Sequence, residues 1–175
     1  QSLYDKTSIN FDIYDSKKPA LAQLIEQYEQ LQTPIIGLHE IEKKDSTKYG
    51  MVKSTEINKH LHKIISLIEK PAPSKAPSNL AIAGKYIVTP ELMQALKKTK
   101  ASGQDKEIRL IDGMKDFVKN KNNHIHGYNI QGTRFDTGDK LGYLKSVVHL
   151  GLKHKELSAE FRKYLKSIDF AKEIR

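Results

Sequence analysis

Four short apolar runs, each bounded by proline, glycine or charged residues, lie between two amphipathic stretches, and this order limits the folds open to the chain. After Pro19 the apolar residues recur at intervals of three and four, and Thr89-Pro90-Glu91 is a typical helix start. The four short apolar runs between these helices predict strands, and the third of them is rich in β-branched residues: TPIIGLHEI, KYGMVKS, HKIISLIEK and LAIAGKYIV. Because no segment repeats, the order predicts an α/β fold whose sheet is covered on both faces.

The carboxyl-terminal half continues the mixture of elements. KEIRLIDGMKDFVKN has helical spacing, HIHGYNIQGTRFDTG alternates like strands with turns, and the two closing stretches, KLGYLKSVVHLGLKH and LSAEFRKYLKSIDFAKEI, each carry an apolar stripe. Residues 1–18 show no sustained period, and we expect a loop or an extended arm there.

The composition is typical of a soluble globular protein. A chain of 175 residues fits one domain, and 38% hydrophobic with 29% charged residues excludes a disordered class. No apolar run approaches the length of a membrane span, and no signal peptide is evident. The absence of cysteine excludes disulfides and thiolate metal sites. We therefore expect a cytoplasmic protein that does not contact membranes.

The net charge of +9 indicates either an anionic partner or a solvated, lysine-rich surface. Nucleic acid receives little support, because only 7% of the residues are aromatic and no Cys/His finger is present. A nucleotide or a sugar phosphate is the alternative anionic partner. We therefore expect small-molecule substrates and no nucleic acid.

Glu69 and Lys70 form an acid–base pair at the end of the third apolar run, in LIEKPAPSKAPSNLAIAG. In a regular strand adjacent side chains point to opposite faces, but at a frayed strand end both can reach one pocket. A carboxylate that accepts sugar hydroxyls beside an ammonium that faces a phosphate suits a sugar phosphate. An ordinary charged strand exit gives the same local pattern.

A second pair of acidic residues lies in RFDTGDKLGYL, just before a predicted helix. Asp139 is placed to cap that helix, which leaves Asp136 to point into a site. A single carboxylate is a typical Mg²⁺ ligand when substrate phosphates and waters complete the octahedron. Taken alone, each residue is more often a turn or cap residue than a metal ligand.

Two His-x-His patterns, at 60–62 and 124–126, invite a zinc interpretation, but the sequence supplies no evident third ligand. The chain also lacks a P-loop, a dinucleotide-binding glycine motif and a G-x-S-x-G elbow. Common phosphate-binding loops and covalent hydrolase chemistry are therefore not indicated.

Read together, the motifs closely resemble those of bacterial UTP–glucose-1-phosphate uridylyltransferases. The resemblance extends from about residue 19 to residue 161, and the spelling EKP…APSNLA joined to DTGDKLGYL is specific to this family among sugar nucleotidyltransferases. The segments that carry it are TKYGMV (47–52), IEKPAPSKAPSNLAIAGKYIVTPEL (68–92), EIRLIDGM (107–114) and RFDTGDKLGYLKSVV (134–148).

The resemblance implies a Rossmann-like, three-layer α/β/α nucleotidyltransferase fold with a mixed sheet. It also implies a reaction in which UTP and α-D-glucose 1-phosphate give UDP-glucose and pyrophosphate with Mg²⁺. By motif, Gly50 would lie against the sugar, Glu69 would accept hydrogen bonds from glucose hydroxyls, and Asn79 would line the same pocket. Lys70 would contact the sugar's phosphate as a catalytic residue. Asp136 would be catalytic as one of two carboxylates that hold Mg²⁺.

The resemblance also predicts that the chain is the carboxyl-terminal part of one nucleotidyltransferase domain, inactive by itself. It divides that part into an arm at 1–18, which looks like an insertion, a sugar-binding region at 19–139 and helices at 140–175. The family's glycine-rich nucleotide loop and the partner metal aspartate have no counterpart in the sequence. For the full-length enzyme we expect a homo-oligomer.

The chain departs from the family's usual GEIQLTDAI, because Arg109 and Ile111 are substitutions within KEIRLIDGM. Two alternatives stay open. One is a glucose-1-phosphate thymidylyltransferase-like enzyme, and the other is a non-catalytic homologue that acts in assembly.

Overall fold

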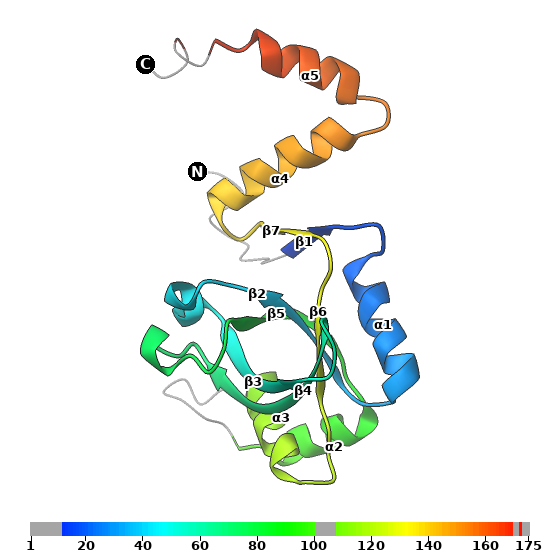
Figure 1. Ribbon diagram of the computed structural model, residues 1–175, viewed down its shortest axis with the longest axis vertical. Coiled ribbons are helices and arrows are strands. Elements are labelled where there is room, and N and C mark those ends of the chain that lie inside the picture. The colour runs from blue at the N-terminus through cyan, green and yellow to red at the C-terminus, as the bar shows by residue number, and fades with distance from the viewer. Residues whose placement is uncertain (1–11, 101–107, 170–171, 173–175) are drawn as a thin grey trace. The chain divides into compact units, whose positions relative to one another are not determined.

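The structure is a computed structural model that describes residues 12–100, 108–169 and 172 (Figure 1). The chain divides into two compact units, Ser16–Gly132 and the combination of Gln1–Asp15 with Thr133–Arg175. Each unit is described by itself below. The finer division of the chain at residues 18 and 139 stays a prediction.

The larger unit is built on five strands that close on themselves. Around the closed sheet the order is β2-β5-β3-β4-β6. The pair β2–β6 is parallel, whereas the other four pairs are antiparallel. The strands are β2 (Ile35–Glu40), β3 (Gly50–Glu56), β4 (Leu61–Glu69), β5 (Leu80–Ile87) and β6 (His126–Asn129). The predicted strands and the mixed sheet of the α/β class are therefore confirmed.

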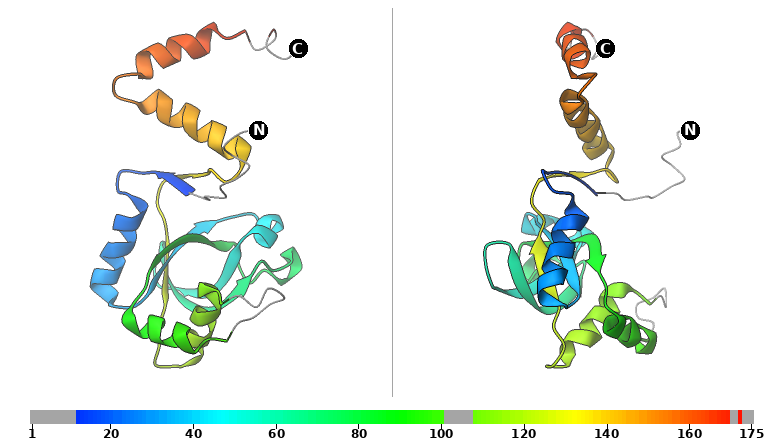
Figure 2. Two further views of the ribbon diagram at one scale, coloured as in Figure 1. Left: turned by 180° about the vertical axis from the view of Figure 1, so that it is seen from behind. Right: turned by 90° about the vertical axis from the view of Figure 1, so that its right-hand side faces the viewer.

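Three helices pack on this sheet at two different sides (Figure 2). Helix α1 (Ala20–Leu31) contacts β2 and β5, while α2 (Pro90–Lys98) pairs with α3 (Leu110–Lys119), which in turn contacts β4. The Thr89 hydroxyl accepts a hydrogen bond from the Leu92 amide, so the predicted helix start is confirmed.

The core of the larger unit lies between the sheet and the α2–α3 pair. It joins strand residues to the apolar faces of the two helices, and burial of this surface is the main stabilising contribution. Its members are Ile36, Leu38, Val52, Ile64, Leu67, Leu80, Ile82, Leu92, Ile111, Met114, Phe117 and Ile125. Two short 3-10 helices, η2 (Lys43–Lys48) and η3 (Pro73–Lys75), contact each other beside the sheet.

The smaller unit contains β1 (Asp12–Asp15), β7 (Thr133–Asp136), α4 (Lys140–Lys153) and α5 (Ser158–Ser167). Strand β1 pairs antiparallel with β7, so residues 12–15 of the predicted 1–18 arm are extended and residues 16–18 form bends, whereas residues 1–11 lie outside the described residues. Helices α4 and α5 meet where the Phe161 ring lies against Gly151, at which a Cβ would come within 2.7 Å of Phe161 Cε1.

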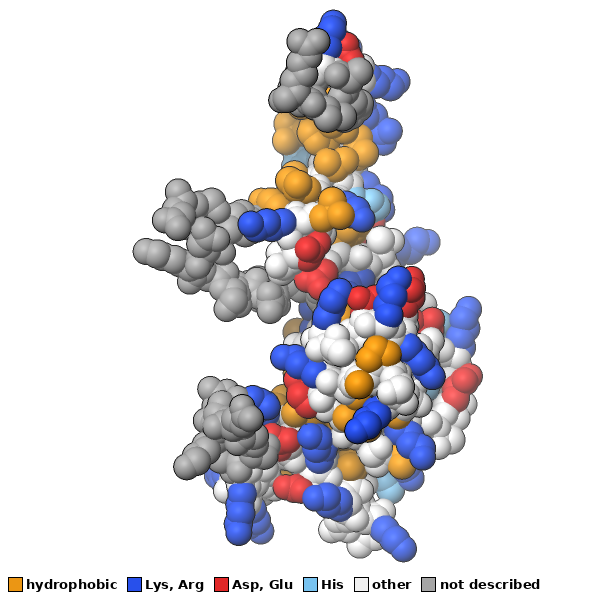
Figure 3. All heavy atoms as spheres, turned by 90° about the vertical axis from the view of Figure 1, so that its left-hand side faces the viewer, with side chains coloured by type: hydrophobic (Ala, Val, Ile, Leu, Met, Phe, Trp, Pro, Cys, Tyr) orange, Lys and Arg blue, Asp and Glu red, His pale blue; other side chains and the backbone are white. Residues whose placement is uncertain are grey.

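Apolar side chains gather on the surface of this smaller unit (Figure 3). On α4, Leu141 is 57% exposed and Leu144 is 60% exposed. Within the described residues, no helix combines the length and the apolarity that a bilayer crossing requires.

Candidate functional site

Gly50 and Glu69, which are far apart in sequence, are cross-strand partners in the pair β3–β4. The sequence placed Glu69 at the carboxyl end of a strand, as in parallel sheets, but β4 runs antiparallel to both of its neighbours. The start of β3 therefore lies beside the end of β4, and the antiparallel register makes this juxtaposition.

The space above the Gly50 backbone is shared by a carboxylate and two isoleucines. A Cβ at this position would lie 3.1 Å from Glu69 Oε2, 3.0 Å from Ile82 Cδ1 and 3.1 Å from Ile111 Cδ1. These distances are tighter than ordinary van der Waals contact, so a side chain at Gly50 would push against these three neighbours. The three neighbours are one carboxylate and two isoleucine methyl groups, so both polar and apolar atoms lie over this part of the strand.

Lys70 directly follows β4 and has a positive φ of 44°. Its ammonium lies 3.8 Å from Glu69 Oε1, and the two side chains are 59% and 30% exposed. The two adjacent charges therefore come together, as expected for a frayed strand end, and the turn of the backbone at Lys70 is the local reason. Their roles toward a sugar phosphate stay a prediction.

Asn79 stands immediately before β5, with an exposed side chain. Its carbonyl accepts a hydrogen bond from the Ile41 amide at 2.9 Å, and the neighbouring Ser78 Oγ donates to the Val52 carbonyl at 2.6 Å. These bonds fix the loop that carries Asn79 to β2 and to β3. Its predicted role in lining the pocket is not tested by these contacts.

Two further residues belong to this part of the larger unit. Burial, and to a smaller extent the negative charge of Glu69, raise the pKa of Tyr86 to about 12. Ile111 reaches the same space from α3. The sequence marked Ile111 only as a substitution and missed Tyr86, although strand alternation from Ile82 was a usable signal.

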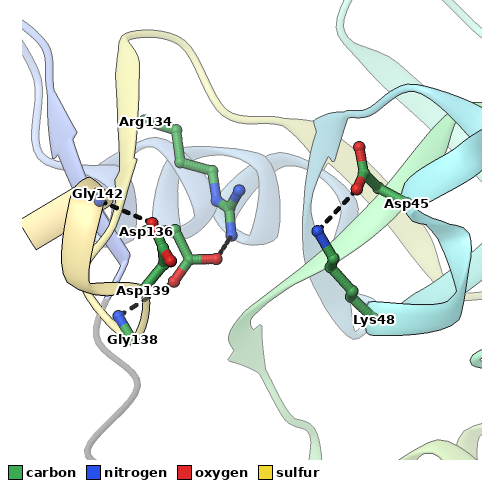
Figure 4. A network of polar contacts seen from close by, with 7 residues as sticks. All are labelled: Asp45, Lys48, Arg134, Asp136, Gly138, Asp139 and Gly142. Atoms are coloured by element: carbon green, nitrogen blue, oxygen red, sulfur yellow. Dashed lines mark hydrogen bonds and ion pairs between the residues drawn. The ribbon is translucent and has the colours of Figure 1, made fainter.

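Asp136 lies in the smaller unit, at the end of β7. Its Oδ2 accepts a hydrogen bond from Arg134 Nη2 at 3.2 Å, and its Oδ1 accepts one from the Gly138 amide at 3.1 Å (Figure 4). Asp139 Oδ2 accepts from the Gly142 amide at 2.8 Å, so its predicted role as the cap of α4 is confirmed. Asp136 therefore does not cap α4, but its carboxylate pairs with the guanidinium of Arg134.

Asp136 has the donor chemistry that Mg²⁺ prefers, because a half-exposed carboxylate is a hard oxygen ligand. No group of three or more His, Asp, Glu or Cys side chains suited to a metal ion occurs in the part of the chain that the structure describes. The residues present therefore fit a cation whose other ligands come from phosphate oxygens and water.

The histidines of the two His-x-His patterns have other surroundings. His126 Nδ1 lies 2.7 Å from Thr33 Oγ1, and His60 Nδ1 lies 2.8 Å from Gln131 Nε2. Burial lowers the pKa of both His62 and His126 below the ordinary value, which favours their neutral forms.

Comparison with known proteins defines the class. Residues 11–150 match the family described as "Nucleotidyl transferase", and the chain belongs to this family. Within this family, the chain is 34% identical over 158 residues to a UTP–glucose-1-phosphate uridylyltransferase of Staphylococcus epidermidis. The matched region covers 90% of this chain and 54% of that protein. The chain thus spans about half the length of this relative.

Solved structures give the same result. A UTP-bound UGPase from Acinetobacter baumannii superposes with a TM-score of 0.75 at 29% identity, covering 91% of this chain and 54% of that one. A UDP-glucose pyrophosphorylase complexed with UDP-glucose gives 0.73 at 29% identity, covering 83% and 54%. The resemblance inferred from the motifs and the nucleotidyltransferase fold class are confirmed.

Proposed function

We propose that this chain forms the sugar-phosphate side of a UTP–glucose-1-phosphate uridylyltransferase. The observation that carries the proposal is that Gly50, Glu69 and Lys70 lie together, which combines a strand position without a side chain, a carboxylate and an ammonium. The uridylyltransferase relatives support the choice of reaction. In that reaction an oxygen of the glucose 1-phosphate attacks the α-phosphorus of UTP, and pyrophosphate leaves.

The roles of the side chains follow from their chemistry. Glu69 accepts hydrogen bonds from glucose hydroxyls, and Gly50 lets the sugar approach the strand backbone closely. Ile111 supplies an apolar wall, and Asn79 offers an amide from the rim. Lys70 neutralises the phosphate and so reduces the repulsion between two anionic substrates as they approach each other.

We propose Asp136 as one of the two carboxylates that hold Mg²⁺. A bound magnesium ion supplies positive charge to the phosphate oxygens. The Gly138 amide holds Oδ1 of Asp136, so Oδ2 is the oxygen that a cation would contact in place of Arg134. Arg134 occupies the same carboxylate and balances its charge when no other cation does.

UTP is the proposed nucleotide, since the A. baumannii relative is described as UTP-bound. A cytoplasmic location is proposed from the cysteine-free composition. A homo-oligomer is proposed for the full-length enzyme because Leu141 and Leu144 expose apolar surface that a second subunit would cover.

Isothermal titration of the chain with glucose 1-phosphate tests the sugar-phosphate site. We expect saturable binding that Glu69→Gln and Lys70→Met each weaken at least about ten-fold, since each removes a charged contact. Lys75→Met is the matched control, because this exposed lysine lies on η3 and carries the same charge change. Equal affinity in all variants, or no saturable binding by the unaltered chain, contradicts the assignment.

The reaction itself is tested in the full-length protein that carries these residues. We expect Lys70→Ala to slow pyrophosphate release from UTP and glucose 1-phosphate by orders of magnitude, because the positive charge that neutralises the phosphate is lost. A rate near that of the unaltered protein sinks the Lys70 assignment. A preference for dTTP over UTP in competition indicates a thymidylyltransferase instead.

A further inference from the structure

Lys70 holds a backbone conformation that its own sequence context disfavours. Among the described residues, only Gln32 and Lys70 are non-glycine residues with positive φ, and Gln32 is the ordinary left-handed cap of α1. Lys70 caps no helix. It also precedes Pro71, and a residue before proline favours extended backbone with negative φ. Something outside the Lys70–Pro71 dipeptide therefore holds it.

The restraint comes from the turn at residues 46–49, through a closed ring of three hydrogen bonds. The Tyr49 amide donates to the Ser46 carbonyl at 3.3 Å, and the Lys70 amide donates to the Tyr49 carbonyl at 3.1 Å. Ser46 Oγ completes the ring by donating to the Pro71 carbonyl at 2.8 Å. Both residues of the strained dipeptide are thus attached to one short segment that leads directly into Gly50.

Ser46 is the only member of this ring that acts through its side chain. It is 0% exposed, and Pro71 is also buried, so water cannot replace the bond between them. Proline has no N–H, and its carbonyl is therefore the one backbone group of Pro71 that a hydrogen bond can hold. Without the hydroxyl, the Pro71 side of the dipeptide loses its attachment to η2.

We propose that Ser46 is a positioning residue for Lys70: its hydrogen bond to Pro71 holds the left-handed turn that places the Lys70 ammonium beside Glu69. Ser46 acts through the backbone, because its side chain donates to the Pro71 carbonyl. The consequence for binding rests on the proposed function, because it requires that Lys70 contact the phosphate. The backbone effect does not depend on that function.

The test compares Ser46→Ala with the unaltered chain by two independent measurements. Backbone ¹³C and ¹⁵N shifts and the HN–Hα coupling of Lys70 report its φ, and we expect them to move toward extended values in the variant. Titration is expected to show a loss of roughly ten-fold in affinity for glucose 1-phosphate and little change for glucose, which lacks the phosphate. Ser146→Ala is the matched control, because Ser146 is equally buried and its Oγ donates to the Tyr143 carbonyl in α4 at 2.7 Å.

Unchanged Lys70 shifts in a folded Ser46→Ala chain overturn the proposal. Equal losses for glucose and glucose 1-phosphate also overturn it, because they show a general loosening of the site. If the unaltered chain does not bind glucose 1-phosphate, the proposed function fails, while the Lys70 shifts still decide the positioning role.

If Ser46→Ala does not fold, Lys70→Gly is added to it. Glycine adopts positive φ without a steric penalty, so restored folding supports the role of Ser46 in holding that turn. A double variant that stays unfolded overturns it.

Discussion

Gly50 lies opposite Glu69 across the β3–β4 pair, and the position where a Gly50 side chain would begin is 3.1 Å from the Glu69 carboxylate oxygen. The neighbouring side chains of Glu69, Ile82 and Ile111 leave too little space for any residue larger than glycine at this position. No positive φ is recorded at Gly50, so the requirement is for space and not for an unusual backbone.

In Gly50→Ala the added methyl displaces Glu69, Ile82 or Ile111. We expect the affinity for glucose 1-phosphate to fall at least about ten-fold and the free energy of unfolding to fall by about 1 kcal/mol. Gly84→Ala is the control on β5. It has a φ of +66° with open space around it, so it destabilises through the backbone and leaves binding unchanged. Titration and urea unfolding of both variants separate the effects, and equal binding losses would contradict the prediction.

Lys70→Gly and Lys70→Ala both remove the ammonium, but only glycine tolerates the positive φ of 44°. We expect the glycine variant to be more stable than the alanine variant by about 1 kcal/mol, the reverse of their usual order in regular structure. Their affinities for glucose 1-phosphate should be equally low. Urea unfolding measures the difference in the free energy of unfolding, and an alanine variant that is the more stable of the two refutes the strain.

Arg134 and a divalent cation compete for the same carboxylate of Asp136. We therefore expect Arg134→Met to raise the affinity of the chain for Mn²⁺, used as a spectroscopic substitute for Mg²⁺, by about two- to five-fold, the range that a half-exposed ion pair provides. Asp136→Asn should remove the gain. Arg162→Met on α5 is the control, since Arg162 donates to the Leu152 carbonyl and contacts no carboxylate in the described residues. Free Mn²⁺ measured by electron paramagnetic resonance gives the affinities, and no difference between the two arginine variants contradicts the competition.

The buried histidines predict acid sensitivity of the larger unit. Burial lowers the pKa of His62 and His126 below the ordinary value of about 6.5, so protonation favours the unfolded chain. The stability they permit is complete above pH 6.5 and falls as the pH drops from 6.5 through their folded values. Urea unfolding across this range should show the decline, and His62→Gln should make it shallower. An identical pH profile in the variant argues against His62 as a source.

The helices and strands of this fold can be predicted from short stretches of sequence, but the pairing of the strands cannot. The helix after Pro19, the Thr89 start and the Asp139 cap could be predicted because capping and apolar spacing act within a few residues. The partnership of Gly50 with Glu69 depends on strand register, which a single sequence does not encode in any local pattern.

The positive φ of Lys70 could not be predicted for a different reason. Its local signals, a lysine before a proline, favour extended backbone, and contacts from residues 46–49 override them. Tyr86 was missed because its relation to Glu69 depends on the order of the strands, in which β3 lies between β4 and β5. Sites of this kind tend to break local rules, and the surrounding structure stabilises the exception.

The parallel pair β2–β6 joins Ile35 to His126, and it is the contact that closes the sheet. During synthesis the larger unit therefore cannot complete itself until β6 has left the ribosome. Until then the edges of β2 and β4 that β6 will cover stay unpaired, and unpaired edges are sites of association between chains. The strand that is made last in this unit thus also protects it from aggregation.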